Sequence, residues 1–62
     1  MNSRITKLAK RLGDVELAGI LVEAGFGLPG DIRRATNKRL KEIEGIGVSQ
    51  MRAIRAVFPK RG

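Results

Sequence analysis

The chain has no cysteine, histidine, tryptophan or tyrosine, and its only aromatic residues are Phe26 and Phe58, both at positions that we expect to be buried. Disulfide bonds, thiolate metal sites, cysteine nucleophiles and histidine-based acid–base catalysis are therefore excluded for this chain. Its six carboxylates are scattered among thirteen lysine and arginine residues, whereas a calcium or magnesium cage needs clustered oxygen ligands. We expect neither enzymatic activity nor a cofactor or metal.

Long apolar runs are also missing. The longest, such as residues 17–22, fall far short of the roughly 20 residues that a membrane-spanning helix needs. The basic segment 4–11 lacks the continuous apolar stretch of a secretory signal. We therefore expect a soluble domain that does not act at a membrane. Because the absence of cysteine fits a reducing compartment, we expect it inside the cell, in the cytoplasm, nucleoid or nucleus.

What the sequence has in excess is positive charge, with a formal net charge of +7 on 62 residues. Such a charge indicates an anionic partner: nucleic acid first, an anionic membrane second and an acidic protein third. A chain of this length forms one small domain, which buries only about 60 % of its unfolded surface. We therefore treat residues 1–62 as a single basic domain.

Apolar residues recur with helical spacing between glycine and proline breaks, which predicts an all-α domain of five helices. No run alternates with period two for long enough to form a strand. The predicted helices are a basic N-terminal helix within 1–13, followed by 15–24, 31–35, 37–44 and 48–58. A basic tail, 59–62, is expected to fray.

Polar residues and glycine mark the ends of these helices. Asn2 or Ser3 can cap the first helix, Asp14 the second and Thr36 the fourth, because their side-chain oxygens can accept hydrogen bonds from the first free amides. Gly13 can take the left-handed conformation that ends a helix. Gly19, inside the second helix, is expected to allow close packing against a neighbouring helix.

Two glycine breaks divide the chain into similar halves. The segments "ILVEAGFGLPGDIRRA" and "LKEIEGIGVSQMRAIRA" both read as helix, Gly-apolar-Gly and helix. An offset of twenty residues superimposes 25–28 on 45–48, and the offset then slips so that Ile32 corresponds to Ile54. The chain is therefore interpreted as a degenerate tandem duplication.

The second break resembles a helix-hairpin-helix motif, whose usual pattern is L-x-x-h-x-G-h-G-x-x-x-A-x-x-I. The residues that match its spacing are Leu40, Ile43, Gly45, Ile46, Gly47, Met51 and Ile54, with Met51 standing where the pattern has alanine. Residues 15–58 as a whole are similar to the tandem helix-hairpin-helix domain at the N-terminus of archaeal and eukaryotic strand-exchange recombinases. In register they are also similar to the C-terminal domain of the bacterial RNA polymerase α subunit. The recombinase ATPase motif G-x-x-x-x-G-K-[ST] is absent.

This resemblance implies five compact helices that present two hairpins on one face and bind the DNA backbone with little sequence preference. The same chemistry follows from the residues. A helix that begins after a tight turn has unpaired, partly positive amides, which can bind a phosphate. Missing side chains at Gly45 and Gly47 would let a phosphate oxygen reach amides 47–50, while Ile46 enters the core. A plain helix–helix turn is the alternative interpretation.

Basic side chains flank the second break. Arg52 and Arg55 each follow an apolar position expected to face inward, so both should project from the outer face of the last helix. Glu42 and Glu44 place negative charge beside the same break. The candidate DNA-binding residues are Gly25, Gly27, Lys41, Gly45, Ile46, Gly47, Val48, Ser49, Gln50, Arg52 and Arg55.

Two functions from different classes remain in competition. The first is a small, non-enzymatic module that binds duplex DNA through its backbone; RNA is an alternative ligand. The second is a protein-interaction adaptor or inhibitor that docks on a polymerase or nuclease subunit. Salt separates them, because phosphate contacts give a log–log dependence of affinity on salt with a slope of about −0.9 per neutralised phosphate.

Overall fold

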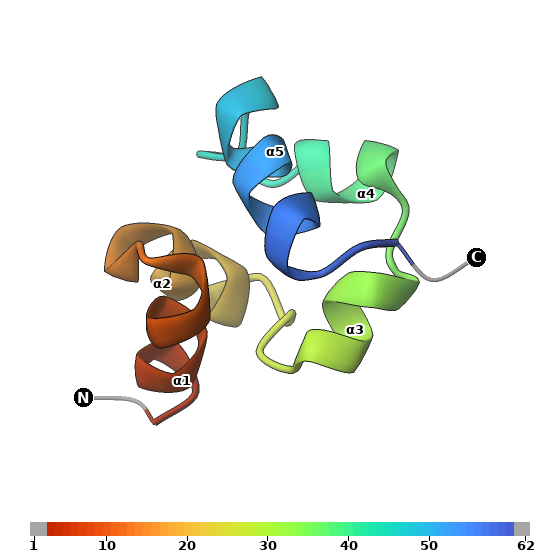
Figure 1. The fold of residues 1–62 in the computed structure, drawn as a ribbon. Coiled ribbons are helices and arrows are strands. Elements are labelled where there is room, and N and C mark those ends of the chain that lie inside the picture. The colour runs from red at the N-terminus through yellow and green to blue at the C-terminus, as the bar shows by residue number, and fades with distance from the viewer. Residues whose placement is uncertain (1–2, 61–62) are drawn as a thin grey trace.

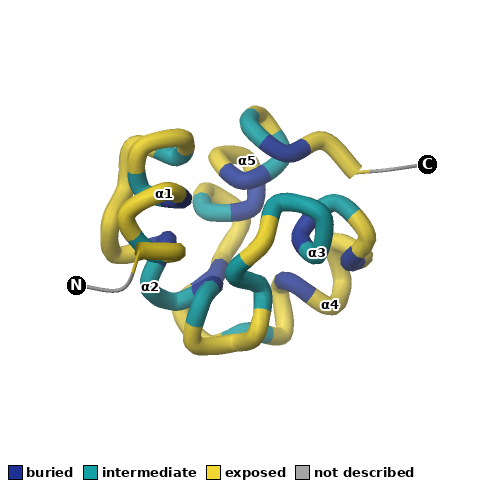
Figure 2. The backbone as a smooth tube through the Cα atoms, turned by 90° about the horizontal axis from the view of Figure 1, so that it is seen from below, coloured by how far each residue is buried: buried dark blue, intermediate teal, exposed yellow. Residues whose placement is uncertain are grey.

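The computed structural model describes residues 3–60, and residues 1–2 and 61–62 lie outside the described part. The described residues form an all-α fold of five helices without a strand, as predicted. The helices are α1 (Ser3–Leu12), α2 (Val15–Glu23), α3 (Pro29–Arg34), α4 (Asn37–Lys41) and α5 (Val48–Val57). Helices α1 and α2 lie to one side and α3 and α4 to the other, with α5 between the two pairs (Figure 1, Figure 2).

The predicted caps set several helix boundaries. The Asp14 carboxylate accepts a hydrogen bond from the Leu17 amide at 3.1 Å, and the Thr36 hydroxyl accepts one from the Arg39 amide at 3.1 Å. Gly13 follows α1 with a φ of +74°, the left-handed conformation that glycine tolerates best. Two other predictions, Asn2 as a cap and fraying at the end of the 59–62 tail, lie outside the described residues in whole or in part.

One apolar core fills the space between the helices. Ile46 is only 6 % exposed, so its predicted entry into the core is confirmed, and Phe58 is fully buried as expected. Phe26 was expected to be buried too, but it is only partly buried and packs against the edge of the core. The buried residues are Leu8, Leu17, Ala18, Leu21, Ile32, Ala35, Leu40, Ile46, Met51, Ile54 and Phe58.

Helix α4 ends earlier than predicted, at Lys41 instead of residue 44. The Ile43 carbonyl accepts a hydrogen bond from the Ile46 amide at 3.1 Å, which closes a four-residue turn in place of another helical turn. Glycine is favoured at the third position of such a turn when φ is positive there, and Gly45 has a φ of +95°. The early end of α4 lets the chain reverse and bring Ile46 into the core.

Candidate nucleic-acid interface

The two glycine breaks share one backbone feature. Gly25, between α2 and α3, has a φ of +93°, and Gly45, between α4 and α5, has a φ of +95°. Residues other than glycine rarely adopt this backbone conformation, so both positions favour glycine strongly. The correspondence that the twenty-residue offset predicts is therefore visible in the backbone at these two residues.

The segment 43–50, which we call the second hairpin, positions its glycines for different reasons. A Cβ atom at Gly45 would lie only 2.9 Å from Cδ1 of Ile20 on α2, so the space beside the Gly45 Cα is already filled. Gly45 thus serves packing and turn geometry, in place of the phosphate access suggested by the sequence. Gly47 has a negative φ of −107°, which other residues also adopt, but a Cβ atom there would lie 3.2 Å from the Gln50 Oε1. Glycine at this position therefore leaves room for the Gln50 side chain.

The amides at the start of α5 are partly paired. The Gly47 amide donates a hydrogen bond to the Gln50 Oε1 at 3.0 Å, so this amide, expected to face a phosphate, already has a partner. The Met51 amide donates to the Gly47 carbonyl at 2.9 Å and starts the helical pattern. Between them, the backbone amides of Val48, Ser49 and Gln50 donate to no acceptor among the described residues. Three donors therefore remain at this helix end.

The glycine break at residues 25–28, which we call the first hairpin, is followed by a helix whose start has fewer free amides. Its helix begins with Pro29, which has no amide hydrogen, and the amides of Asp31 and Ile32 both donate to the Leu28 carbonyl, at 3.0 and 3.3 Å. The Asp31 carboxylate also lies in the first turn of α3, where it disfavours a second anion. The geometry therefore separates the two hairpins by degree: among the described residues, three amides lack an acceptor at the start of α5, whereas at the start of α3 only the Gly30 amide does.

Gly25 and Gly27, the candidate residues of the first hairpin, have other surroundings. A Cβ atom at Gly27 would lie 3.0 Å from the Arg4 Cδ, so this glycine makes room for the Arg4 side chain. Gly25 is exposed and borders a surface depression that also contains the Asp31 carboxylate and Arg34. Arg34 is 3.7 Å from that carboxylate and also donates to the Gly30 carbonyl. Neither glycine lies at an open helix start.

Basic side chains lie on one flank of the second hairpin. Lys41 from α4, together with Val48 and Arg52 from α5, borders a surface depression of about 250 Å³. The Lys41 and Arg52 side chains are exposed, and neither forms an ion pair with a described residue. The structure therefore brings together two predicted cations and the first residue of α5.

Acidic side chains lie on the other flank. Asp14 and Glu16 of the α2 start border a smaller depression of about 130 Å³ together with Gly45 and Gln50. Glu44 is exposed on the same hairpin. Because like charges repel, the field around the hairpin favours an anion on the Lys41 flank and disfavours one on the Asp14 flank.

Arg55 does not project outward as predicted. Its guanidinium donates hydrogen bonds to the carbonyls of Ile32 at 3.0 Å, Ala35 at 2.6 Å and Phe58 at 3.2 Å, and to the Asn37 Oδ1 at 2.7 Å. Burial lowers the pKa of this guanidinium from its ordinary value. Its donors are used inside the protein because α3 ends beside α5, which leaves Arg52 as the exposed arginine of this helix.

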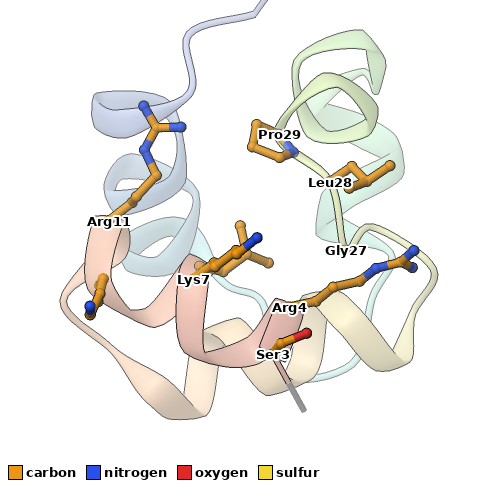
Figure 3. A pocket seen from close by; sticks show the side chains of 9 residues that line it. Ser3, Arg4, Lys7, Arg11, Gly27, Leu28 and Pro29 are labelled. Atoms are coloured by element: carbon orange, nitrogen blue, oxygen red, sulfur yellow. The ribbon is translucent and has the colours of Figure 1, made fainter.

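Sequence reasoning missed a larger surface feature. A groove of about 550 Å³ lies between one side of α1, residues 3–11, and residues 27–29; we call it the α1 groove (Figure 3). Two features of the sequence could have indicated this groove. One is the set of cations at positions 4, 7 and 11, which share one helix face, and the other is the apolar pair Leu28-Pro29 in a loop. These signals are far apart in the chain, so only the fold brings them together.

Neither a membrane-spanning helix nor a metal site adds a candidate among the described residues. In the part of the chain that the structure describes, no helix is long and apolar enough to cross a membrane. Within residues 3–60, no group of three or more His, Cys, Asp or Glu side chains is placed to hold a metal ion. No protein-family model, curated protein or solved structure matches the chain.

Proposed function

We propose that this domain is a non-enzymatic DNA-binding module that contacts the phosphate backbone of duplex DNA with little dependence on base sequence. The observation that carries the proposal is a juxtaposition at the second hairpin. Unpaired amides at the start of α5 lie next to the depression that Lys41 and Arg52 border, and neither cation has an acidic partner among the described residues.

Each part of this arrangement favours a phosphate. The start of an α-helix carries about half a positive charge, and its free amides point away from the helix toward a potential ligand. A guanidinium such as that of Arg52 can donate two parallel hydrogen bonds to one phosphate, whereas the Lys41 ammonium acts as a mobile point charge. None of these groups reads a base edge, so they predict backbone contact without sequence selection.

The acidic flank orients the ligand. With Asp14 and Glu16 on one side of the hairpin, the DNA backbone approaches from the α4 side, over Lys41 and Arg52. A single site of this size is expected to bind in the range of non-specific DNA affinity, about 10⁻⁴–10⁻⁶ M near physiological salt. The net charge of +7 adds a long-range attraction that increases the association rate at low salt.

The test is an amide-shift titration of isotope-labelled protein with a 12-base-pair duplex of random sequence, repeated over a series of salt concentrations. We expect the shifts to concentrate at residues 45–52 and to weaken as salt rises. Lys41→Ala and Arg52→Ala should each reduce the magnitude of the log–log salt slope by about 0.9, because each removes one phosphate contact. Lys7→Ala is the matched control, since it removes the same charge from α1 and should leave the hairpin shifts in place.

Two results would overturn the proposal. One is a duplex titration at low salt in which residues 45–52 do not shift. The other is equal loss of affinity in Lys7→Ala, Lys41→Ala and Arg52→Ala, because a diffuse charge effect does not depend on the hairpin. A parallel titration with duplex RNA of the same sequence tests the nucleic acid: tighter binding of RNA would replace DNA as the ligand.

A further inference from the structure

The α1 groove has the shape of a site for an extended or helical segment. It follows α1 from Ser3 to Arg11, a length of about 12 Å at 1.5 Å per residue, and its volume is about 550 Å³. Its opposite wall is the loop at residues 27–29 (Figure 3). This is more than twice the volume of the depression beside Lys41 and Arg52, at about 250 Å³.

The inner surface of the groove is apolar. Leu8 of α1 lies at its floor but is only 2 % exposed, so Leu28 and Pro29 of the loop supply the apolar surface that is open to a partner. Leu28 is 50 % exposed and is one of the few large apolar side chains that the fold leaves in water. Contact with a partner would remove this apolar surface from water, which is favourable in proportion to the area covered.

The rim of the groove is positively charged. Arg4, Lys7 and Arg11 follow one another at helical spacing along the groove side of α1, Lys10 adds a fourth cation, and none of the lining residues is a carboxylate. Lys7 and Lys10 form no ion pair with a described residue. The Arg11 guanidinium lies 5.3 Å from the centroid of the Phe58 ring, which holds it in place without neutralising its charge.

We propose that the α1 groove binds an acidic, amphipathic helical segment of a partner protein. Such a segment places its apolar side chains against Leu28 and Pro29 and its carboxylates next to Lys7 and the arginines of the rim. An amphipathic helix bound in a groove uses anchors at positions i, i+3, i+4 and i+7, a span of about two turns that matches the length of this surface. A DNA backbone could pair with the rim but would leave Leu28 in water, so the groove fits an acidic peptide better.

This site is independent of the proposed DNA contact. The groove is built by α1 and residues 27–29, whereas the hairpin site is built by α4 and α5, and no residue lines both. The two proposals therefore respond to different substitutions. Changes at Lys7 or Leu28 test the groove, and changes at Lys41 or Arg52 test the hairpin.

The experiment is an amide-shift titration of the 62-residue protein with a synthetic 12-residue peptide that has capped ends. In this peptide, leucines recur at spacings of three and four residues, and glutamates fill the other positions. We expect shifts in residues 3–11 and 27–29. Lys7→Glu should weaken binding about fivefold by reversing one rim charge, and Leu28→Ser about fivefold by removing an apolar contact. Lys38→Glu makes the same charge reversal at an exposed position of α4, outside the groove, and should leave the affinity for the peptide unchanged.

A scrambled peptide of identical composition separates a built site from simple charge attraction. It should bind at least about fivefold more weakly, because its leucines no longer share one face. Equal binding of the two peptides, or shifts located outside the groove, would refute the docking site. A 12-base-pair duplex is added to the peptide complex as a competitor. If it displaces the peptide and shifts residues 3–11, the groove is a nucleic-acid site and the peptide proposal fails.

Discussion

The Arg55 side chain on α5 donates a hydrogen bond of 2.6 Å from Nη2 to the carbonyl of Ala35, the residue that caps the C-terminal end of α3. Its Nη1 donates to the carbonyls of Ile32 and of Phe58, the residue that caps α5. The last carbonyls of a helix have no intrahelical donor, so they need partners from elsewhere. One guanidinium thus pairs the ends of two helices and joins α3 to α5.

Arg55→Ala is therefore predicted to destabilise the fold strongly. Hydrogen bonds to a charged group contribute about 1.5–3 kcal/mol, so we expect the free energy of unfolding to fall by about 2–3 kcal/mol. For a domain of this size this corresponds to a decrease in melting temperature of more than about 10 °C. Arg55→Lys should give an intermediate value, because an ammonium cannot reproduce the planar fork of donors. Thermal unfolding followed by circular dichroism measures both.

Arg52→Ala is the matched control for this prediction, since it removes the same residue type from the same helix. Arg52 is exposed, and its substitution should change stability by less than about 0.5 kcal/mol. Equal destabilisation by the two variants would show that the Arg55 hydrogen bonds contribute little. In the DNA titration only the Arg52 variant should alter the direct contact, so the two arginines have separable roles.

The features that could be predicted from the sequence are those encoded locally. The helical periodicity of apolar residues, and caps such as Asp14 and Thr36, depend on residues three or four positions apart. The helix order and most of the core follow from these patterns. The positive φ values at Gly25 and Gly45 likewise follow from a turn chemistry that neighbouring residues specify.

The features that could not be predicted depend on contacts between distant segments. Arg55 was expected to be exposed because its helix position favours the outer face, but its carbonyl partner Ala35 lies 20 residues away in the sequence. The space at Gly45 is filled by Ile20 from another helix. The α1 groove likewise joins α1 to residues 27–29. No periodicity carries such information, because it arises only when the helices pack.

Gly19→Ala is predicted to stabilise the protein. Gly19 was expected to allow close helix packing, but a Cβ atom there meets no heavy atom within 4 Å, so that expectation is wrong. Alanine in the middle of a helix is favoured over glycine by about 0.5–1 kcal/mol, chiefly because the unfolded chain is less flexible. Urea unfolding should show a higher midpoint with an unchanged slope. A lower midpoint would mean that this position does need the space.

Gly45→Ala is predicted to have the opposite sign. The φ of +95° is strained for alanine, and the new Cβ would lie 2.9 Å from the Ile20 Cδ1. We expect a loss of about 1–3 kcal/mol from the backbone alone. Adding Ile20→Val removes the clashing methyl group, so a double-mutant cycle should show a favourable coupling between the two changes. Additive losses would indicate that the strain is entirely in the backbone.

Gln50→Glu separates stability from DNA binding. The carboxylate keeps an acceptor for the Gly47 amide and adds a negative charge to the first turn of α5, which stabilises a helix by about 0.3–1 kcal/mol. The same charge lies beside the proposed phosphate site, and at about 5 Å in water it should weaken DNA binding about fourfold. Thermal unfolding and a duplex titration at low salt measure the two effects. Unchanged DNA affinity would place the phosphate away from the start of α5.

Glu16→Gln tests the direction from which the phosphate approaches. Glu16 borders the acidic depression next to Gly45 and Gln50, so it opposes an anion at the hairpin. Removing a charge about 10 Å from a phosphate in water should strengthen binding about twofold at low salt. The gain should disappear near 1 M salt, where screening acts over about 3 Å. Glu23→Gln, at the other end of α2, is the control with the same charge change, and an equal gain there would mean that only net charge matters.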